Sequence, residues 1–158
     1  MVAIAGFISV EKIVQQNFSG LLKGYAPGVY QMEKDANPVY SGYQAVETLA
    51  NTKARVLLIY SDNDPLVHKA PHYDALYAAL KDKPNVRLML QSGKGHSPHY
   101  TARAVEQKDA FFADLKKMRK KPSTDAQKKA FLDRYDWNIM TEQDAAVWEE
   151  ILKTLEEV

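Results

Sequence analysis

The clearest pattern in the chain is a short, continuously apolar run that ends in a polar turn. Residues 56–60 read Val-Leu-Leu-Ile-Tyr, and the residues after them are Ser61, Asp62, Asn63, Asp64 and Pro65. An apolar run without polar alternation is typical of a strand covered on both faces, as in a parallel sheet. This segment therefore predicts a buried strand that leads into a polar loop.

The next apolar positions have the spacing of an amphipathic helix. Positions i, i+3, i+4 and i+7 of one stripe are Tyr73, Leu76, Tyr77 and Leu80. Such a stripe places four apolar side chains on one helix face. Residues 83–85 (Lys-Pro-Asn) end this helix, and residues 86–90 form a second apolar run. The order strand, helix, strand predicts a βαβ unit with parallel strands.

The N-terminal third is less regular. Residues 2–8 predict another buried strand, and residues 9–23 predict a helix. Residues 24–38 contain two glycines and two prolines, which favour a loop-rich stretch. We expect a further helix over about residues 40–50, which leads into the strand at residue 56.

The C-terminal part is predicted to be helical over residues 101–118, 125–134 and 142–156. Thr101 is placed to cap the first of these helices. Two pairs have the spacing of capping boxes and would open the other two helices: Thr124 with Gln127, and Thr141 with Asp144. We expect the last helix to bury Ala145, Trp148, Ile151, Leu152 and Leu155.

These elements predict an α/β fold with about three parallel strands and flanking helices. Three strands are fewer than the five or six that a sheet usually has, so we expect part of a larger sheet. Residues 1–120 carry a net charge of +5, and residues 121–158 carry −4. We therefore divide the chain into an α/β body over 1–120 and an acidic helical extension over 121–158 that packs on it.

Composition narrows the classes of function. The 158 residues contain 21 Lys and Arg against 20 Asp and Glu, which argues against a dedicated nucleic-acid binder. With no cysteine, the chain has no disulfide, no Cys-ligated metal and no Cys nucleophile. The longest apolar stretches are far shorter than the roughly 18 residues of a membrane helix. No secretion signal is evident, so we expect a cytoplasmic protein that does not bind membranes.

Polar clusters follow the two clearest strands. Residues 61–67 read Ser-Asp-Asn-Asp-Pro-Leu-Val, and residues 91–98 read Gln-Ser-Gly-Lys-Gly-His-Ser-Pro. In open α/β sheets, ligands bind outside the carboxyl ends of the strands. Loops at the ends of adjacent parallel strands can touch, so an acid of the first loop can hydrogen-bond the imidazole of the second. Such a bond fixes the histidine tautomer that a general base requires.

Residues 56–67 resemble the strand and acid turn of the α/β-hydrolases, and residues 95–98 (Gly-His-Ser-Pro) resemble their catalytic-histidine loop. The family order is Ser, then Asp or Glu, then His, and the last two members occur here in that order. The resemblance implies that Asp64 is the triad acid and that His96 is the general base. It covers about residues 1–119 and implies that residues 9–50 form the cap or lid.

Two features depart from the family pattern. The family acid usually lies three residues after a turn glycine, and Ser61 stands in that place before Asp64. Asp62 is therefore the weaker candidate for the acid. None of the seven serines has the G-x-S-x-G surrounding of the family's nucleophile. We therefore expect this chain to be the C-terminal half of such a hydrolase. The serine and the oxyanion-hole amides would belong to an N-terminal half that this chain lacks.

The resemblance implies hydrolysis of an ester, thioester or amide of a small acyl substrate through an acyl-enzyme, with no cofactor and no metal. The isolated chain is expected to be inactive. We expect it to join its missing half, or to associate with itself through the open sheet edge. The side chains expected to line the acyl pocket under the lid are Phe18, Leu21, Leu22, Tyr25 and Tyr30.

Other interpretations stay open. The half-sheet is also compatible with a non-catalytic α/β binding or assembly module, or with a small nucleotide-binding domain that lacks a glycine-rich fingerprint. Asp64 before Pro65 has the pattern of a helix N-cap. His68 and His72 have the i, i+4 spacing of metal ligands, but there is no H-E-x-x-H motif, and a solvated helix face is enough to explain them. The basic run at residues 116–121 is typical of a solvated helix end.

Overall fold

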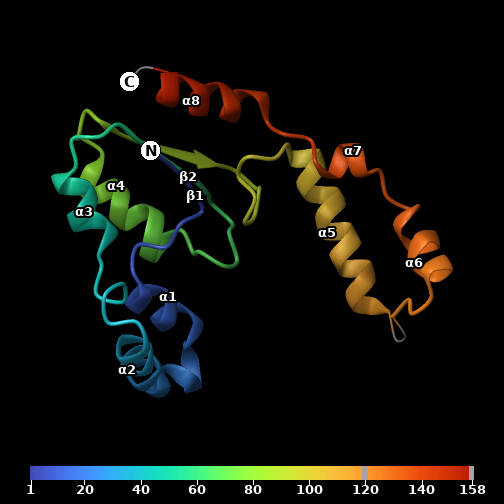
Figure 1. The fold of residues 1–158 in the computed structure, drawn as a ribbon, viewed down its shortest axis with the longest axis horizontal. Coiled ribbons are helices and arrows are strands. Elements are labelled where there is room, and N and C mark those ends of the chain that lie inside the picture. The colour runs from blue at the N-terminus through green and yellow to red at the C-terminus, as the bar shows by residue number, and fades with distance from the viewer. Residues whose placement is uncertain (119–120, 157–158) are drawn as a thin grey trace. The chain divides into compact units, whose positions relative to one another are not determined.

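The computed structural model describes residues 1–118 and 121–156 and shows an α/β arrangement (Figure 1). Its elements in chain order are β1 (Val2–Ile4), α1 (Val10–Asn17), η1 (Gly20–Tyr25), α2 (Ala26–Ala36), α3 (Ala45–Asn51), β2 (Val56–Ser61), η2 (Ala70–Asp74), α4 (Ala75–Leu80), β3 (Val86–Gln91), α5 (Ala102–Lys117), α6 (Asp125–Leu132), α7 (Trp137–Met140) and α8 (Ala145–Glu156). Among the described residues, no helix combines the length and the apolar character needed to cross a membrane.

The three strands form one parallel sheet in the order β1-β2-β3. This confirms the predicted βαβ unit, in which α4 connects β2 to β3. β2 and β3 pair in register from Val56 opposite Val86 to Ser61 opposite Gln91. The carboxyl ends of these two strands therefore lie at the same level, which brings their loops together.

β2 is buried along its whole length, as its uniform apolar character predicts. One face of the sheet packs against α3 and α4, whose Leu49, Leu76 and Leu80 are buried there. On this face β2 contributes Val56, Leu58 and Tyr60. Burial of one leucine side chain stabilises a fold by about 1.5–3 kcal/mol, so this layer holds the loops of the site in place.

β1 is shorter and more exposed than predicted. The sequence favoured a buried strand over residues 2–8, whereas the strand ends at Ile4 and is only half-buried. Ala5 has a φ of 50°, a left-handed conformation that a strand cannot contain. β1 is also an edge strand, because among the described residues it pairs with β2 on one side and with no strand on the other. An edge strand leaves one side uncovered, so uniform apolarity did not indicate burial here.

The predicted loop at residues 24–38 is largely helical, which corrects the sequence interpretation. α2 begins at Ala26, and Pro27 lies in its first turn. Proline is tolerated there because the first backbone N–H groups of a helix have no partner within the helix. Proline breaks a helix when it lies in the interior, but here it lies in the first turn, where the helix accommodates it. The predicted helix over 9–23 is divided into α1 and the 3₁₀ turn η1.

The beginning of the last helix also differs from the prediction. The Thr124–Gln127 capping box is present at α6. Thr141 instead follows the unpredicted short helix α7 and donates to the Trp137 carbonyl. At the beginning of α8, the Asp144 carboxylate accepts hydrogen bonds from the N–H groups of Ala146 at 3.0 Å and Val147 at 3.2 Å. The carboxylate of Asp144 is thus the cap itself.

α8 buries a different stripe from the predicted one. Its buried side chains are Val147, Ile151 and Thr154, whereas Trp148, Leu152 and Leu155 are exposed. Of the predicted set, only Ile151 is buried. Both stripes have helical spacing, so the sequence pattern alone did not decide between them.

The chain divides into two compact units, residues 1–98 with 151–158 and residues 99–150. The boundary between the two units falls at Pro98. The boundary predicted at residue 120 lies outside the described residues. Arg119 and Lys120 of the basic run lie outside them as well. Within the second unit, Phe111 of α5 packs against Phe131 and Trp137 with ring centroids 5.3 and 5.8 Å apart. Helices α6 and α7 of the extension therefore pack on α5, and the three form one small core, whereas the part of α8 from Ile151 onward belongs to the first unit.

Candidate functional site

The loops after β2 and β3 are joined by side-chain hydrogen bonds. The Asp62 carboxylate accepts from the Gly93 N–H and from the Ser92 hydroxyl, each at 2.8 Å. The Asn63 amide oxygen accepts from the Gly95 N–H at 2.8 Å, and the Ser61 hydroxyl accepts from the Lys94 N–H at 3.0 Å. Three consecutive residues of the first loop thus hold the second loop in a fixed position.

Asp64 and His96 meet at the centre of these loops. The Oδ2 atom of Asp64 lies 2.8 Å from Nδ1 of His96. The Asp64 side chain is 0% exposed, whereas that of His96 is 44% exposed. A carboxylate only accepts, so Nδ1 carries a proton, and in the neutral ring Nε2 then has the lone pair. The pair therefore consists of a buried acid and an accessible imidazole whose orientation the acid fixes.

The other oxygen of Asp64 organises its own loop. Oδ1 accepts from the N–H groups of Leu66 at 2.8 Å and Val67 at 3.0 Å. These are the bonds of an N-cap, but the residues directly after Pro65 are not helical, and the next helical segment begins at Ala70. The helix-cap interpretation of Asp64 therefore holds for the bonds and not for a helix. The Asp64 carboxylate therefore orients the imidazole of His96 with one oxygen and fixes its own loop, residues 64–67, with the other.

Asp62, the second candidate for the acid, has a different role. Hydrogen bonds from the Gly93 N–H and the Ser92 hydroxyl lower the pKa of this exposed carboxyl. Both of its oxygens face the histidine loop rather than the imidazole. The structure therefore pairs His96 with Asp64 and uses Asp62 to anchor the loop.

Two glycines shape the histidine loop. Gly93 and Gly95 have φ values of 71° and 52°, in the left-handed region that side chains disfavour. Their N–H groups are the donors to Asp62 and Asn63. The loop conformation that delivers His96 to Asp64 therefore requires glycine at both positions.

Ser61 and Ser92 lie in the same two loops as the Asp64–His96 pair. Ser61 is fully buried and donates to the Asn63 side chain. Ser92 donates to the Asp62 carboxylate. Both hydroxyls therefore hold the loops together, and neither is directed to the imidazole.

A second polar network, which the sequence did not indicate, ties helix α1 to the acid loop. Gln16 of α1 donates to the Leu66 carbonyl at 2.9 Å and accepts from the His68 N–H at 2.9 Å. Its amide oxygen also lies 3.1 Å from Nε2 of His72, and Nδ1 of His72 accepts from the Ile8 N–H at 3.2 Å. Residues 9–50, here named the cap segment after the role expected for them, are thereby fastened through α1 to the residues that follow Asp64.

His72 is fully buried, so the solvated helix face expected for it is wrong. The spacing of His72, Leu76 and Leu80 by four residues was a signal for burial, since both leucines lie on the core face. Because the Ile8 N–H can only donate, the ring must be neutral, with its proton on Nε2. Burial lowers the pKa of His72, and the nearby positive charge of His68 adds to this effect.

We expect the free energy of unfolding to fall as the pH decreases below about 6.5, the ordinary histidine pKa. The unfolded chain then binds a proton at His72 that the folded chain does not accept, so protonation favours unfolding. Urea unfolding at pH 7 and pH 5 measures this effect. His72→Gln should reduce the dependence on pH much more than His68→Gln, which lies at an exposed position and removes only the smaller charge contribution of His68. Equal pH dependence in the native protein and His72→Gln would contradict the assignment.

The cap segment contains a cavity of about 710 Å³ between α1, η1 and α2. Of the side chains predicted to line an acyl pocket, Phe18 and Tyr30 line this cavity. Leu21, Leu22 and Tyr25 are exposed and do not line it, which corrects that part of the prediction. They lie on the 3₁₀ turn η1, whose tighter winding changes the direction of each side chain relative to an α-helix.

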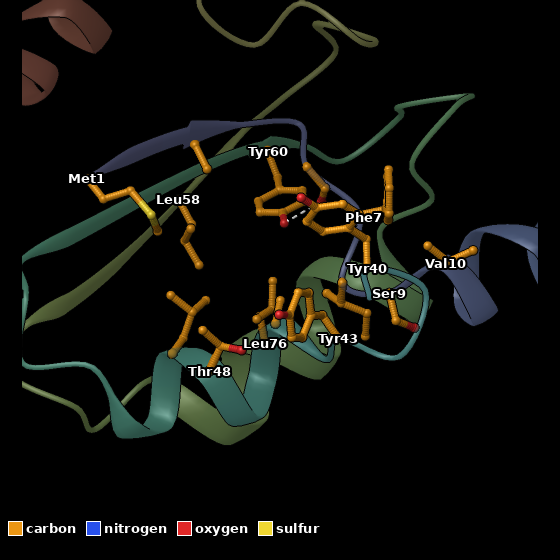
Figure 2. Close-up of a pocket in the computed structure, with 15 residues that line it drawn as sticks. Met1, Phe7, Ser9, Val10, Tyr40, Tyr43, Thr48, Leu58, Tyr60 and Leu76 are labelled. Atoms are coloured by element: carbon orange, nitrogen blue, oxygen red, sulfur yellow. Dashed lines mark hydrogen bonds between the residues drawn. The ribbon is translucent and has the colours of Figure 1, made fainter. Parts of the chain in front are cut away.

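A second cavity of about 610 Å³ lies between the sheet and helices α3 and α4 (Figure 2). Its lining includes Leu58, Tyr60 and Leu76, and Tyr60 donates to the Gly6 carbonyl at 2.6 Å. Burial raises the pKa of Tyr60 to about 12, so its hydroxyl stays protonated. The Asp64–His96 pair is not part of this lining.

In the part of the chain that the structure describes, no three His, Asp or Glu side chains converge as metal ligands would. The chemistry that the arrangement offers is therefore that of the Asp64–His96 pair, a buried acid and an accessible base. No protein-family model, curated protein or solved structure gives a significant match to this chain.

Proposed function

We propose that this chain supplies the acid and the general base of a serine α/β-hydrolase, in which Asp64 orients His96 and His96 activates a serine from another polypeptide segment. The observation that carries the proposal is the 2.8 Å contact between Asp64 Oδ2 and His96 Nδ1, with the acid buried and the base accessible. Support also comes from the order of strand, acid, helix, strand and histidine along the chain.

In this reaction Nε2 of His96 takes the proton of the serine hydroxyl as the oxygen attacks the acyl carbon. Asp64 stabilises the resulting imidazolium through Nδ1–H. The base then returns the proton to the leaving group, which departs and leaves an acyl-enzyme. Water, deprotonated by the same nitrogen, releases the acid. Esters, thioesters and amides are the substrate classes that suit this chemistry, and it needs no cofactor.

The experiment starts from the coding DNA on the 5′ side of the Met1 codon, read in the same frame for a G-x-S-x-G segment. A protein with both segments should hydrolyse p-nitrophenyl esters and should be labelled on the serine by a fluorophosphonate. The 158-residue chain alone should do neither, because acyl transfer needs the nucleophile and the oxyanion donors together. Failure of the joined protein in both assays would refute the proposal.

A non-catalytic binding or assembly module is the second candidate. The observation in its favour is that none of the seven serines has the G-x-S-x-G surrounding of a hydrolase nucleophile. In such a module the Asp64–His96 contact would fix the loop conformation and nothing more. An unrelated gene directly upstream, with its own stop codon and a ribosome-binding site before Met1, would favour this candidate.

A further inference from the structure

The outer edge of β1 has backbone groups that point away from the sheet. The Leu57 N–H donates to the Met1 carbonyl at 2.9 Å, and the Ala5 N–H donates to the Ile59 carbonyl at 2.8 Å. A parallel strand bonds to one neighbour through every second residue, so residues 1, 3 and 5 face β2. The N–H and C=O groups of Val2 and Ile4 therefore point outward, where the described residues contain no further strand.

The cavity beside this edge, here named the edge cavity, is apolar. It lies between the sheet, from which Met1 and Leu58 point inward, and the helices, from which Thr48 and Leu76 point toward them (Figure 2). Ala3 also lines it, and the small side chain leaves the space next to the edge unfilled. The cavity is continuous with the core, because Leu58, Tyr60 and Leu76 belong to both.

Large apolar side chains are exposed around the edge cavity. Met1, Phe7, Tyr40 and Tyr43 line it and are each at least half exposed. None of its fifteen lining residues is Asp, Glu, Lys or Arg. A contiguous apolar surface of this kind marks an interaction site, and its lack of charged side chains favours an equally uncharged partner surface.

A second copy of the chain matches this edge. In an antiparallel pair centred on Ala3, Val2 of one copy exchanges two hydrogen bonds with Ile4 of the other, and the symmetry repeats the exchange. The two-fold axis is perpendicular to the sheet, so both edge cavities lie on the same face. No charged side chain lines either cavity, so the two linings meet without like-charge repulsion.

We propose that the chain forms a symmetric dimer through β1, with a continuous six-stranded sheet and the two edge cavities side by side. The proposal concerns the 158-residue chain and uses no residue of the Asp64–His96 site. A polypeptide segment that supplied the serine and extended the sheet would compete with the second copy for the edge of β1. The dimer removes the unpaired edge, which is otherwise a site for uncontrolled association.

Cysteine cross-linking tests the predicted register. The chain has no cysteine, so Ala3→Cys creates a protein with a single thiol. The two Ala3 residues form a non-hydrogen-bonded pair with Cα atoms about 4.5 Å apart, within the range of a disulfide. Mild oxidation should convert Ala3→Cys into a covalent dimer much faster than Tyr77→Cys, which places a thiol at an exposed position that does not line the edge cavity. Equal rates for the two variants would overturn the proposed register.

A proline substitution tests the edge without a new side-chain contact. Val2→Pro removes an outward N–H that β2 does not use, and a proline is tolerated at the first residue of an edge strand. Each dimer then lacks two hydrogen bonds, so its dissociation constant should rise roughly tenfold in sedimentation equilibrium. Leu90→Pro removes an outward N–H from the opposite edge, β3, and should leave the constant unchanged. Far-UV circular dichroism verifies that both variants fold.

A charge at the cavity provides an independent check that does not depend on the backbone. Phe7→Lys should also weaken the dimer, whereas Tyr77→Lys should not, because Tyr77 is exposed outside the edge cavity. A native protein that is monomeric at all concentrations would overturn the proposal. So would a dimer that neither Val2→Pro nor Phe7→Lys weakens.

Discussion

His96→Ala is expected to lower the rate of ester hydrolysis by about 10⁶-fold in the proposed joined protein, which contains this chain and the segment with the nucleophilic serine. Removal of the base of a catalytic triad has an effect of this size. The variant has no Nε2 to take the serine proton. Its fold should persist, because the imidazole is 44% exposed and Asp64 keeps its bonds from the Leu66 and Val67 N–H groups.

Steady-state kinetics with p-nitrophenyl esters measure this loss, and urea unfolding verifies that the variant is folded. His68→Ala is the matched control, since its side chain is exposed and none of its side-chain atoms takes part in the site. That control should retain nearly full activity. If His96→Ala kept turnover within tenfold of the native rate, His96 would not be the base.

Asp64→Asn is expected to lower kcat by about 10⁴-fold, because the amide would impose the wrong tautomer on His96. The Leu66 and Val67 N–H groups hold the carbonyl oxygen of the new side chain, as they hold Oδ1 of Asp64. Its NH₂ group then faces Nδ1 of His96, which must accept. The imidazole proton moves to Nε2, where a base needs a lone pair.

Nitrogen-15 NMR of the imidazole reads this change directly, and it works on the 158-residue chain without a serine. The neutral ring should be the Nδ1–H form in the native chain and the Nε2–H form in Asp64→Asn. Asp62→Asn serves as the control, because that carboxylate bonds Ser92 and Gly93 rather than the imidazole. If the native chain and Asp64→Asn had the same tautomer, Asp64 would not be the residue that sets the tautomer of His96.

Residue pattern predicted the βαβ unit because local and tertiary signals agree there. Residues 56–61 are apolar and central, so uniform hydrophobicity and burial on both faces coincide. At β1 the same apolar pattern occurs on an edge, and the left-handed Ala5 ends the strand after three residues. At α2, Pro27 and Gly28 signalled a loop because the sequence does not show which turn of a helix they occupy.

Burial was the property that local pattern predicted least well. His72 is as hydrophilic as His68, yet one is enclosed by Ile8 and Gln16 and the other is exposed. In α8 two stripes with helical spacing compete, and the structure buries the one that contains Val147 and Ile151. Which side of a helix is covered depends on distant segments, so helical periodicity by itself leaves both choices open.

By itself, the sequence determined that this protein has two parallel strands joined by a helix, each followed by a polar loop, with one loop carrying Asp64 and the other His96. Only the tertiary structure decided that Asp64 rather than Asp62 meets the imidazole, and that Gln16 and His72 fasten the cap segment to the acid loop. Periodicity and turn chemistry are encoded by neighbours along the chain. The choice between two carboxylates two residues apart depends on the register of β2 against β3 and on the left-handed glycines, which only the folded chain sets.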